Sequence, residues 1–199
     1  MYKKFFKRLI DIIASALAII VLAFPMIIVA IAIKVDSKGP VFFKQERVGL
    51  NKKNFKIIKF RSMTTDTPKD CPTHLLSKEN SHITKVGAFI RKTSLDELPQ
   101  FFNVFSSKMS IIGPRPALYN QYDLIAERDK YGANNVKPGI SGWAQINGRD
   151  ELPIDIKAKL DGEYVKKLSF SFDIKCFVKT ISRVLKRDGV KEGGTGGKL

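Results

Sequence analysis

Cysteine, histidine and acidic residues are all scarce in this chain. Its 199 residues include two cysteines, Cys71 and Cys176, and two histidines, His74 and His82. The cysteines are too few and too far apart to form a disulfide framework or a metal motif, which favours a reducing compartment. The histidines lack the spacing of metal ligands and are interpreted as ordinary surface residues. A site built on cysteine or histidine is therefore not expected.

Acidic residues number 19 against 35 lysines and arginines, which leaves a formal net charge of +16 and a pI near 9.9. Such an excess indicates an anionic partner, whether nucleic acid, a membrane surface or a phosphorylated ligand. No internal repeat is present, and the length suits one domain with a real core. The 44% hydrophobic and 10% aromatic content excludes wholesale disorder. Composition alone does not choose among the three kinds of partner.

One stretch lacks charge altogether. Ile12 to Ile33 contains no charged residue, and at about 1.5 Å per helical residue it is long enough to cross a bilayer core of roughly 30 Å. It begins close to the N-terminus and has no small-residue cleavage site, so we expect a retained membrane anchor rather than a removable signal peptide. No second charge-free run is long enough to span a membrane.

The flanks of this run favour an anchor that enters and leaves by the same face. Basic residues lie on both sides, so the positive-inside rule draws both ends, and with them both termini, to the cytoplasmic side. Pro25 removes a backbone hydrogen bond past the middle of the run and kinks the helix. A re-entrant helical hairpin accounts for both observations, and an ordinary kinked span is the alternative. The flanking basic residues are Lys3, Lys4, Lys7, Arg8, Lys34 and Lys38.

Two short strand-like runs follow the anchor, Val41 to Glu46 and Phe55 to Arg61, around a turn at Gly49 to Asn51. The stretch is rich in lysine and arginine, which suits a solvated face or a surface against anionic headgroups. Lys59 and Arg61 differ from the others because apolar residues flank them. We take these two as candidates for an inward-facing anion site.

Two adjacent carboxylates, Asp96 and Glu97, mark the stretch around which the chain is organised. Ser94 followed by Glu97 reads as a capping box, and the apolar residues from Leu98 onward have helical spacing, so we expect a helix to begin here. A helix N-terminus keeps a nearby carboxylate ionised and can hold a phosphate. Asp96 is thus a candidate anionic nucleophile and Glu97 a candidate metal ligand or helper. The alternative is that the pair only caps the helix.

Two arginines are candidates for fixed cations beside these carboxylates. Arg91 ends a short helix expected from Thr84 to Lys92. Arg115 lies between Pro114 and Pro116, which restrict the backbone and hold one guanidinium on a stiff turn suited to bidentate phosphate recognition. A plain surface turn is the alternative for Arg115.

The stretch from Lys137 to Arg149 is punctuated by glycines that permit close backbone approach to a ligand, and we expect a loop there. Gln145, Asn147 and Arg149 supply hydrogen-bond donors. Trp143, the only tryptophan, lies either near a ligand or in the core. Asp161, in the helix that follows, is a further candidate carboxylate at the site.

Three further helices are expected, from Ala117 to Lys130, Leu152 to Leu168 and Phe170 to Arg187. The last has an apolar face and a cationic side, so it can lie in the membrane interface or dock onto the protein's own core. Thr65 to Asn80 is polar and is expected to form a loop over the site. Gly193 to Leu199 is expected to be a flexible tail.

Five motifs occur in the order seen in one family. They are the apolar segment broken at Pro25, Lys59 to Met63, Ser94 to Gln100, Gly113 to Pro116 and Pro138 to Gln145. In these the chain resembles, over essentially its whole length, the bacterial sugar transferases that are monotopic phosphoglycosyl transferases, in their minimal form. Ala117 to Tyr122 looks most like the capsule-synthesis members.

The resemblance implies a mostly helical α+β fold in a monotopic membrane protein. It divides the chain into a re-entrant membrane helix (1–36), a small catalytic domain with interfacial amphipathic helices (37–190) and a flexible tail (191–199), at the cytoplasmic face of the bacterial inner membrane. One departure is Phe24, because well-known members have serine before the proline. Phenylalanine lacks the hydroxyl that satisfies backbone groups at the break, so the hairpin angle does not follow from the resemblance.

The implied reaction moves a sugar 1-phosphate from a UDP-sugar to undecaprenyl phosphate and releases UMP, as the first membrane step of capsule, O-antigen or glycoprotein glycan assembly. It is a ping-pong reaction through a phosphosugar bound covalently to Asp96. Asp96 and Glu97 are the implied Mg²⁺ site, with Glu97 as the main ligand. Family analogy favours an N-acetylated 6-deoxy amino sugar. The substrate-binding candidates are Lys59, Arg61, Arg91, Arg115, Trp143, Gln145, Arg149 and Asp161.

Two alternatives stay open. An enzyme on the same scaffold would transfer the sugar directly, without a covalent intermediate. A membrane-anchored basic protein that binds acidic lipid or nucleic acid would have a broad basic face with aromatic platforms. Here the basic residues are interleaved with glycines, prolines and acids, so nucleic acid is not an expected partner. Membrane lipids are, and the sequence leaves a homo-oligomer open.

Overall fold

The computed structural model describes residues 1–67, 82–148 and 152–186, and these form an α+β fold in which helices predominate. Arg149, the predicted tail at 191–199 and most of the predicted loop at 65–80 lie outside the described residues. The helices are α1 (Lys7–Asp36), α2 (Lys85–Lys92), α3 (Gln100–Phe105), α4 (Tyr122–Asp129), α5 (Trp143–Ile146), α6 (Ile154–Lys167) and α7 (Phe170–Lys186), and the strands are β1 (Phe42–Val48), β2 (Asn54–Phe60), β3 (Ser110–Ile112) and β4 (Gly139–Ser141).

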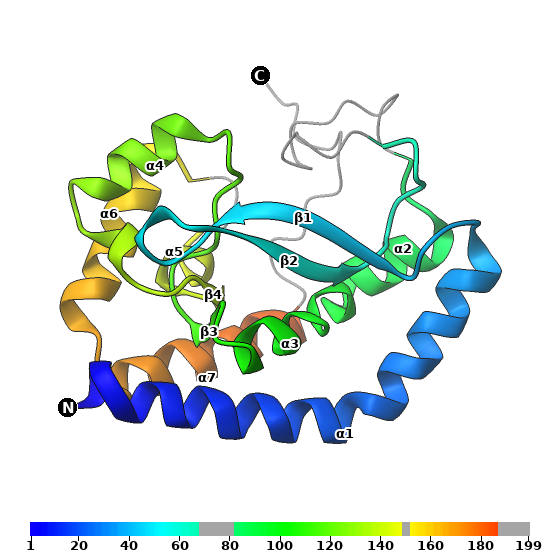
Figure 1. Ribbon diagram of the computed structural model, residues 1–199, viewed down its shortest axis with the longest axis horizontal. Helices are drawn as coiled ribbons and strands as arrows, with labels where there is room; N and C mark the ends of the chain where they lie inside the picture. Colours follow the sequence, from blue (N-terminus) through cyan, green and yellow to red (C-terminus); the bar gives the residue numbers. More distant parts are fainter. Residues whose placement is uncertain (68–81, 149–151, 187–199) are drawn as a thin grey trace.

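The apolar run forms α1, one helix of 30 residues that is long and apolar enough to cross a membrane. Pro25 lies inside it, and the helix bends visibly on its way past the rest of the protein (Figure 1). It stays continuous, so the structure has a bent helix rather than two helices joined by a turn. Large apolar side chains point outward along it. The most exposed are Ile13, Leu17, Ile20, Val21, Phe24, Ile27, Ile28, Ile31 and Val35.

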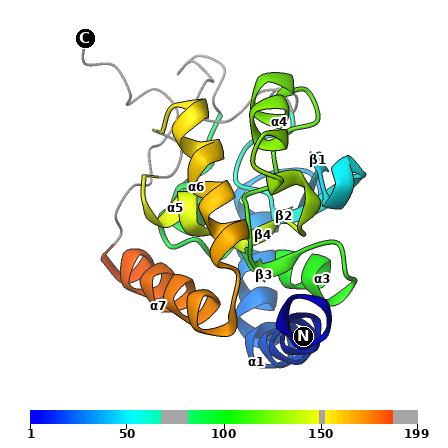
Figure 2. The same cartoon turned by 90° about the vertical axis from the view of Figure 1, so that its left-hand side faces the viewer.

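Both ends of α1 are held by the same folded body. Near the N-terminus, Arg8 donates to the carbonyl oxygens of Val104 and Phe105 at 2.7 and 2.8 Å. Near the C-terminus, Val29 and Ile33 are buried with residues of β2 and α2. Figure 2, which looks along α1, shows α3 and α7 on different sides of it. The bent helix therefore frames the rest of the fold instead of projecting away from it.

Strands β1 and β2 form an antiparallel hairpin in which Phe43 faces Lys59. Its turn at Leu50–Lys52 places Asn51 and Lys52 at positive φ. This confirms the two expected strands and the position of the turn. The outer edge of β2 is covered by Asn103 of α3, whose amide accepts from the Ile58 N–H at 2.9 Å and donates to the Lys56 carbonyl at 2.9 Å.

Strands β3 and β4 form a short parallel pair. Glycine is needed here for close approach, because a Cβ on Gly139 would lie 2.1 Å from the Gly113 nitrogen. Beside the pair lies a core cluster that includes Tyr164 of α6 and Cys176 of α7. The helix expected at Thr84 to Lys92 and those of α6 and α7 are confirmed to within two residues.

Two sequence-based expectations differ from the structure. The helix expected from Ala117 begins only at Tyr122, because Leu118 instead pairs as an extended residue with Arg47 and its N–H donates to the Gln121 side chain. The stretch expected to be a loop from Lys137 holds β4 and the single turn α5. In both places tertiary pairing of the backbone overrides local preference.

Candidate active site

The backbone around the two carboxylates differs from the expected capping box. Ser94 adopts a left-handed conformation, with φ of 58°, and its side chain makes no capping hydrogen bond. Leu95–Glu97 form a single 3₁₀ turn, and α3 starts only at Gln100. The capping box is therefore wrong: Glu97 is drawn to cations from other elements, which bind a carboxylate more strongly than a backbone amide does.

Glu97 is held by two cations. Its Oε1 accepts a hydrogen bond from Lys59 Nζ at 2.8 Å and from Arg115 Nη2 at 2.9 Å. The lysine comes from β2, and the arginine comes from the turn after β3. Burial alone raises the pKa of Glu97, but Arg115 and Lys59 together outweigh it and hold the pKa well below its usual range. Glu97 is thus a carboxylate that stays ionised.

Asp96 lies beside Glu97 in the opposite electrostatic situation. Its side chain is buried and lines a pocket. Burial raises the pKa of Asp96, the charge of Glu97 adds to that rise, and Lys59, Arg91 and Arg115 oppose it only in part. One carboxylate of the pair is therefore neutralised by fixed cations, and the other is a destabilised anion that faces a cavity.

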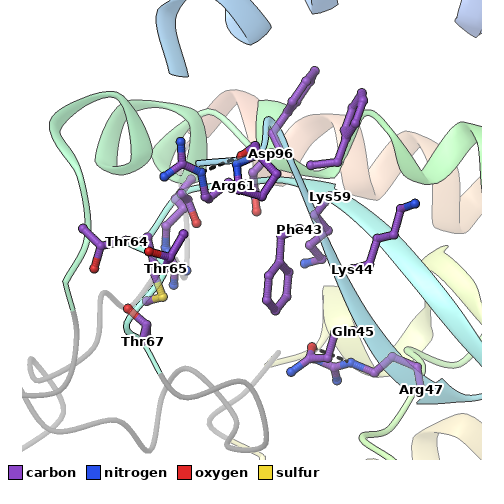
Figure 3. Close-up of a pocket in the computed structure, with 16 residues that line it drawn as sticks. Phe43, Lys44, Gln45, Arg47, Lys59, Arg61, Thr64, Thr65, Thr67 and Asp96 are labelled. Carbon is purple, nitrogen blue, oxygen red and sulfur yellow. Dashed lines mark hydrogen bonds between the residues drawn. The ribbon is translucent and has the colours of Figure 1, made fainter. Parts of the chain in front are cut away.

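The pocket lies between the β1–β2 hairpin, the segment after β2 and Asp96 (Figure 3). Arg91 reaches it from α2, and within the described part of the chain the buried Nε of Arg91 has no hydrogen-bond partner. The same holds for the hydroxyls of Thr64 and Thr67, which also line the pocket. Buried polar atoms left in this way are suited to a polar ligand.

Sequence reasoning missed one wall of this pocket. Phe43, Gln45 and Arg47 alternate along β1 and point into the cavity, where Arg47 donates to Gln45 Oε1. Alternate residues of a strand share a face. If the register that pairs Phe43 with Lys59 had been known, the pocket side of β1 could therefore have been predicted from the sequence. The register itself depends on the fold, because no sequence rule assigns Phe43 to Lys59.

Arg61 lines the pocket, but its guanidinium donates hydrogen bonds to the protein's own backbone. Its Nε, Nη1 and Nη2 donate to the carbonyl oxygens of Pro40, Lys38 and Ser37 at 2.7, 2.7 and 2.8 Å. The side chain is buried, with 5% exposure. Arg61 was expected to bind substrate. In the structure it lies at the pocket, as expected, and its guanidinium is hydrogen-bonded to backbone carbonyl groups.

The turn that carries Arg115 is anchored on the parallel strand pair. The Gly113 N–H donates to the Ser141 carbonyl at 2.8 Å, and the Gly139 N–H donates to the Pro114 carbonyl at 2.9 Å. Both bonds lie on the N-terminal side of Arg115, and on its other side the Pro116 carbonyl accepts from Arg47 Nη1 at 3.1 Å. The guanidinium reaches Glu97 from a rigid frame, as the flanking prolines suggested.

Two other predicted site residues, Trp143 and Gln145, have contacts away from the carboxylate pair. Trp143 packs against Phe172 and donates to Glu163 at 3.2 Å, and Gln145 donates to the Ile140 carbonyl at 3.2 Å. Neither is among the residues that line the described pocket.

Asp161 is buried between α4 and α6. It accepts hydrogen bonds from Arg128 at 2.8 and 2.6 Å, which joins the two helices. Arg128 is itself buried, with 5% exposure of its side chain. The observed role of Asp161 is thus an internal ion pair, and the pocket lining does not include it.

The carboxylate pair is the place at which Mg²⁺ was expected to bind. Within the described residues no group of three or more histidine, cysteine or acidic side chains gathers in a way that could hold a metal. Magnesium is commonly bound through one or two carboxylates completed by substrate phosphates. Asp96 and Glu97 fit that arrangement, and they would hold the ion together with a phosphorylated substrate.

Comparison with known proteins places this architecture in a family. The model of the family described as bacterial sugar transferase matches residues 2–187. The undecaprenyl-phosphate glucose phosphotransferase of Komagataeibacter xylinus is 42% identical over 187 residues, which cover 89% of this chain and 35% of that protein. An uncharacterized sugar transferase, EpsL, of Bacillus subtilis (strain 168) is 39% identical over 186 residues, covering 94% of this chain and 90% of its own length.

A third relative, the UDP-N-acetylgalactosamine-undecaprenyl-phosphate N-acetylgalactosaminephosphotransferase of Aeromonas hydrophila, is 39% identical over 193 residues, which cover 94% of this chain and 45% of that protein. The chain belongs to the bacterial sugar transferase family and is a transferase. It spans 35% to 45% of the length of most relatives compared and nearly all of the Bacillus protein.

Proposed function

We propose that the protein transfers a sugar 1-phosphate from a UDP-sugar to undecaprenyl phosphate and releases UMP. The names of the relatives carry the substrate classes. The observation that supports the proposed chemistry is the difference between the two carboxylates. Asp96 is buried and faces a pocket, whereas Glu97 is neutralised by two cations.

The reaction proceeds in two displacements at one phosphorus atom. An oxygen of the Asp96 carboxylate attacks the sugar-proximal phosphorus, the bond to the bridging oxygen breaks, and UMP leaves with that oxygen. An oxygen of undecaprenyl phosphate then attacks the same phosphorus and releases the Asp96 carboxylate. An anion destabilised by burial is a stronger nucleophile than a solvated one, and Arg91 lies in the same pocket to face the diphosphate.

Mg²⁺, when bound by Glu97 and Asp96 with the donor, would neutralise phosphate charge as the bond breaks. Glu97 is suited to this because Lys59 and Arg115 keep it ionised and fix its position. Arg115 pairs with Glu97 while 35% of its side chain is exposed, so it can also meet a phosphate oxygen.

The protein is proposed to be monotopic, with α1 entering and leaving the membrane by one face. Both ends of α1 are attached to the same polar body, and its outward side is apolar. α7 adds a second exposed apolar surface, which suits the interface. Its exposed large apolar residues are Phe170, Ile174, Phe177, Val178, Ile181 and Val184.

The deciding experiment is UMP release by nanodisc-embedded protein given undecaprenyl phosphate, Mg²⁺ and a panel of UDP-sugars. The panel includes glucose, N-acetylgalactosamine and N-acetylated 6-deoxy amino sugars. We expect release with one donor and none with Asp96→Asn. Silence across the panel from folded protein would favour a non-catalytic basic protein of the membrane surface.

The covalent step is tested separately with radiolabelled donor and no acceptor. We expect a protein-bound phosphosugar that appears together with one equivalent of UMP and is absent from Asp96→Asn. Normal turnover without an adduct would instead favour direct transfer from donor to acceptor.

A further inference from the structure

The chain leaves the membrane helix through a tight turn, Ser37–Pro40, which we term the exit turn. Gly39 within it has a φ of +123°, a conformation that L side chains rarely adopt. A Cβ at Gly39 would lie 2.9 Å from Cγ2 of Thr65 and 3.3 Å from Nη1 of Arg61. The exit turn is therefore pressed against two residues that line the pocket.

Arg61 holds the exit turn through three hydrogen bonds, which together we term the clamp. All three of its side-chain nitrogens donate to carbonyl oxygens of the turn, at Ser37, Lys38 and Pro40. Its own backbone N–H donates to the Val41 carbonyl at 2.9 Å, which ties it to the start of β1. A planar guanidinium can serve three acceptors in one plane, whereas a lysine ammonium has a single nitrogen.

The same end of α1 also supports the carboxylate pair. Asp36 Oδ2 accepts from the Val86 N–H at 3.0 Å in the first turn of α2, the helix that carries Arg91. Val29 and Ile33 form a buried cluster with residues of β2 and α2, and Leu95 and Leu98, on either side of the carboxylates, pack against that cluster. The catalytic turn thus rests directly on the membrane helix.

We propose that Arg61 is a positioning residue, which locks the exit turn and so fixes the height of Asp96 relative to the bilayer for the lipid-linked acceptor. The inference rests on the proposed function. A UDP-sugar reaches the pocket from water at any height, but the phosphate of a polyprenol is confined to the headgroup level by its chain. A loosened exit turn therefore impairs the second displacement while sparing the first.

The test separates the two half-reactions in Arg61→Lys, which keeps the charge and loses the three-acceptor geometry. We expect the rate of acceptor-independent UMP release to stay within about threefold of wild type. We expect transfer from the adduct to undecaprenyl phosphate in nanodiscs to fall by roughly tenfold or more. Each charge-assisted hydrogen bond lost from the exit turn weakens the closed turn by a free energy comparable to a tenfold change in its equilibrium constant. The loss should appear mainly in the KM for the acceptor.

A second variant and a control keep the test independent of this one substitution. Gly39→Ala strains the exit turn with Arg61 intact and should show the same split. Lys38→Ala removes an exposed cation of the turn but keeps its carbonyl group, and both half-reactions should stay near wild type. Equal losses in both half-reactions of Arg61→Lys would show that Arg61 binds substrate, and no loss in either would remove its positioning role.

A readout without turnover distinguishes this inference from the proposed function. Hydrogen exchange should be faster in Arg61→Lys than in wild type at the amides of Ser37 and of residue 61, which donate to the Ile33 and Val41 carbonyls at 3.2 and 2.9 Å. If wild-type protein releases no UMP from any donor, the proposed function fails, and with it the inference that Asp96 is positioned for the lipid-linked acceptor. If the rates of hydrogen exchange are the same in Arg61→Lys and wild type, Arg61 does not hold the exit turn, whatever the activity.

Discussion

At the scale of single residues, the carboxylate pair shows how two adjacent acids acquire different chemistry. Asp96 and Glu97 share a turn, but the cations that touch Glu97 come from β2 and from the segment after β3. Asp96 is left with burial as its dominant influence. Within the described residues, the cations at hydrogen-bond distance reach Glu97 and not Asp96, so the proposed nucleophile and the ion-paired carboxylate differ although they are neighbours.

Substituting each carboxylate in turn should change stability in opposite directions at neutral pH. Asp96→Asn removes a buried anion that the fold disfavours, so the thermal midpoint should rise while turnover is lost. Glu97→Gln leaves Lys59 and Arg115 without their anion and should cost roughly 2 kcal/mol or more. Thermal unfolding in detergent with a metal chelator measures both, and a fall in the midpoint for both variants would contradict the assigned environments.

The advantage of Asp96→Asn should depend on pH. The folded-state pKa of Asp96 is raised, so its ionisation costs stability as pH rises from the ordinary carboxylate value of about 4 through the higher folded value. The difference in midpoint between variant and wild type should therefore be largest near neutrality and vanish towards pH 4. Glu97 has the opposite sign, because its contribution is present above about pH 4 and is lost only as acid protonates the ion pair. A pH-independent difference for Asp96→Asn would contradict the raised pKa.

At the scale of elements, Asp173 joins α7 to the beginning of α1. Its carboxylate accepts from Tyr2 at 2.5 Å, from Lys7 at 2.7 Å and from Tyr164 at 2.8 Å. The side chain is 9% exposed and that of Lys7 is 14% exposed, so the ion pair is shielded from water. The amphipathic helix was expected either to dock or to lie in the interface, and in the structure it docks on one side while its apolar residues face outward on the other.

Asp173→Asn should therefore destabilise the protein by about 3 kcal/mol, because it leaves a buried lysine without its counter-ion. The free energy of unfolding in denaturant, measured in one detergent, reports this change. Asp155→Asn, at an exposed acid near the start of α6, is the matched control and should change stability by less than about 0.5 kcal/mol. Equal effects of the two substitutions would show that the Asp173 cluster contributes little.

At the scale of the whole molecule, the folded body occupies the inside of the bend in α1 (Figure 1). Arg8 and Asp11 attach the first turns of the helix to α3 and β3, and Asp36 attaches its last turn to α2. One polar body cannot lie on both sides of a bilayer, so this arrangement favours entry and exit by the same face.

Single cysteines at Met1 and at Lys38, both exposed, should test that topology. In a background without the natural cysteines, a membrane-impermeant maleimide should label neither site in intact spheroplasts and both after permeabilisation. A cysteine at Val21, on the outward apolar side of α1, should stay protected in both conditions. Labelling of one terminal site in intact spheroplasts would indicate an ordinary span and would contradict the re-entrant arrangement.

The sequence by itself determined the parts of this protein that depend on local pattern. Charge-free length and Pro25 predicted a long apolar segment with a kink, and two strand-like runs around a turn predicted the β1–β2 hairpin. The positions of α2 and α6 were also predicted, and the spacing of apolar residues predicted α7. The order of motifs identified the family before any fold was known. These features can be read from a sequence because each depends on residues within a few turns of one another.

Only the tertiary structure decided how distant residues share the site. Ser94 makes no capping hydrogen bond because Glu97 pairs with cations from two other elements, and the guanidinium of Arg61, a predicted substrate-binding residue, donates to carbonyl groups of the exit turn. Asp161 found Arg128 instead of the pocket. The physical reason is common to all of them: a buried charge takes the partner that the packing of other elements brings within hydrogen-bond distance, and no local pattern specifies that partner.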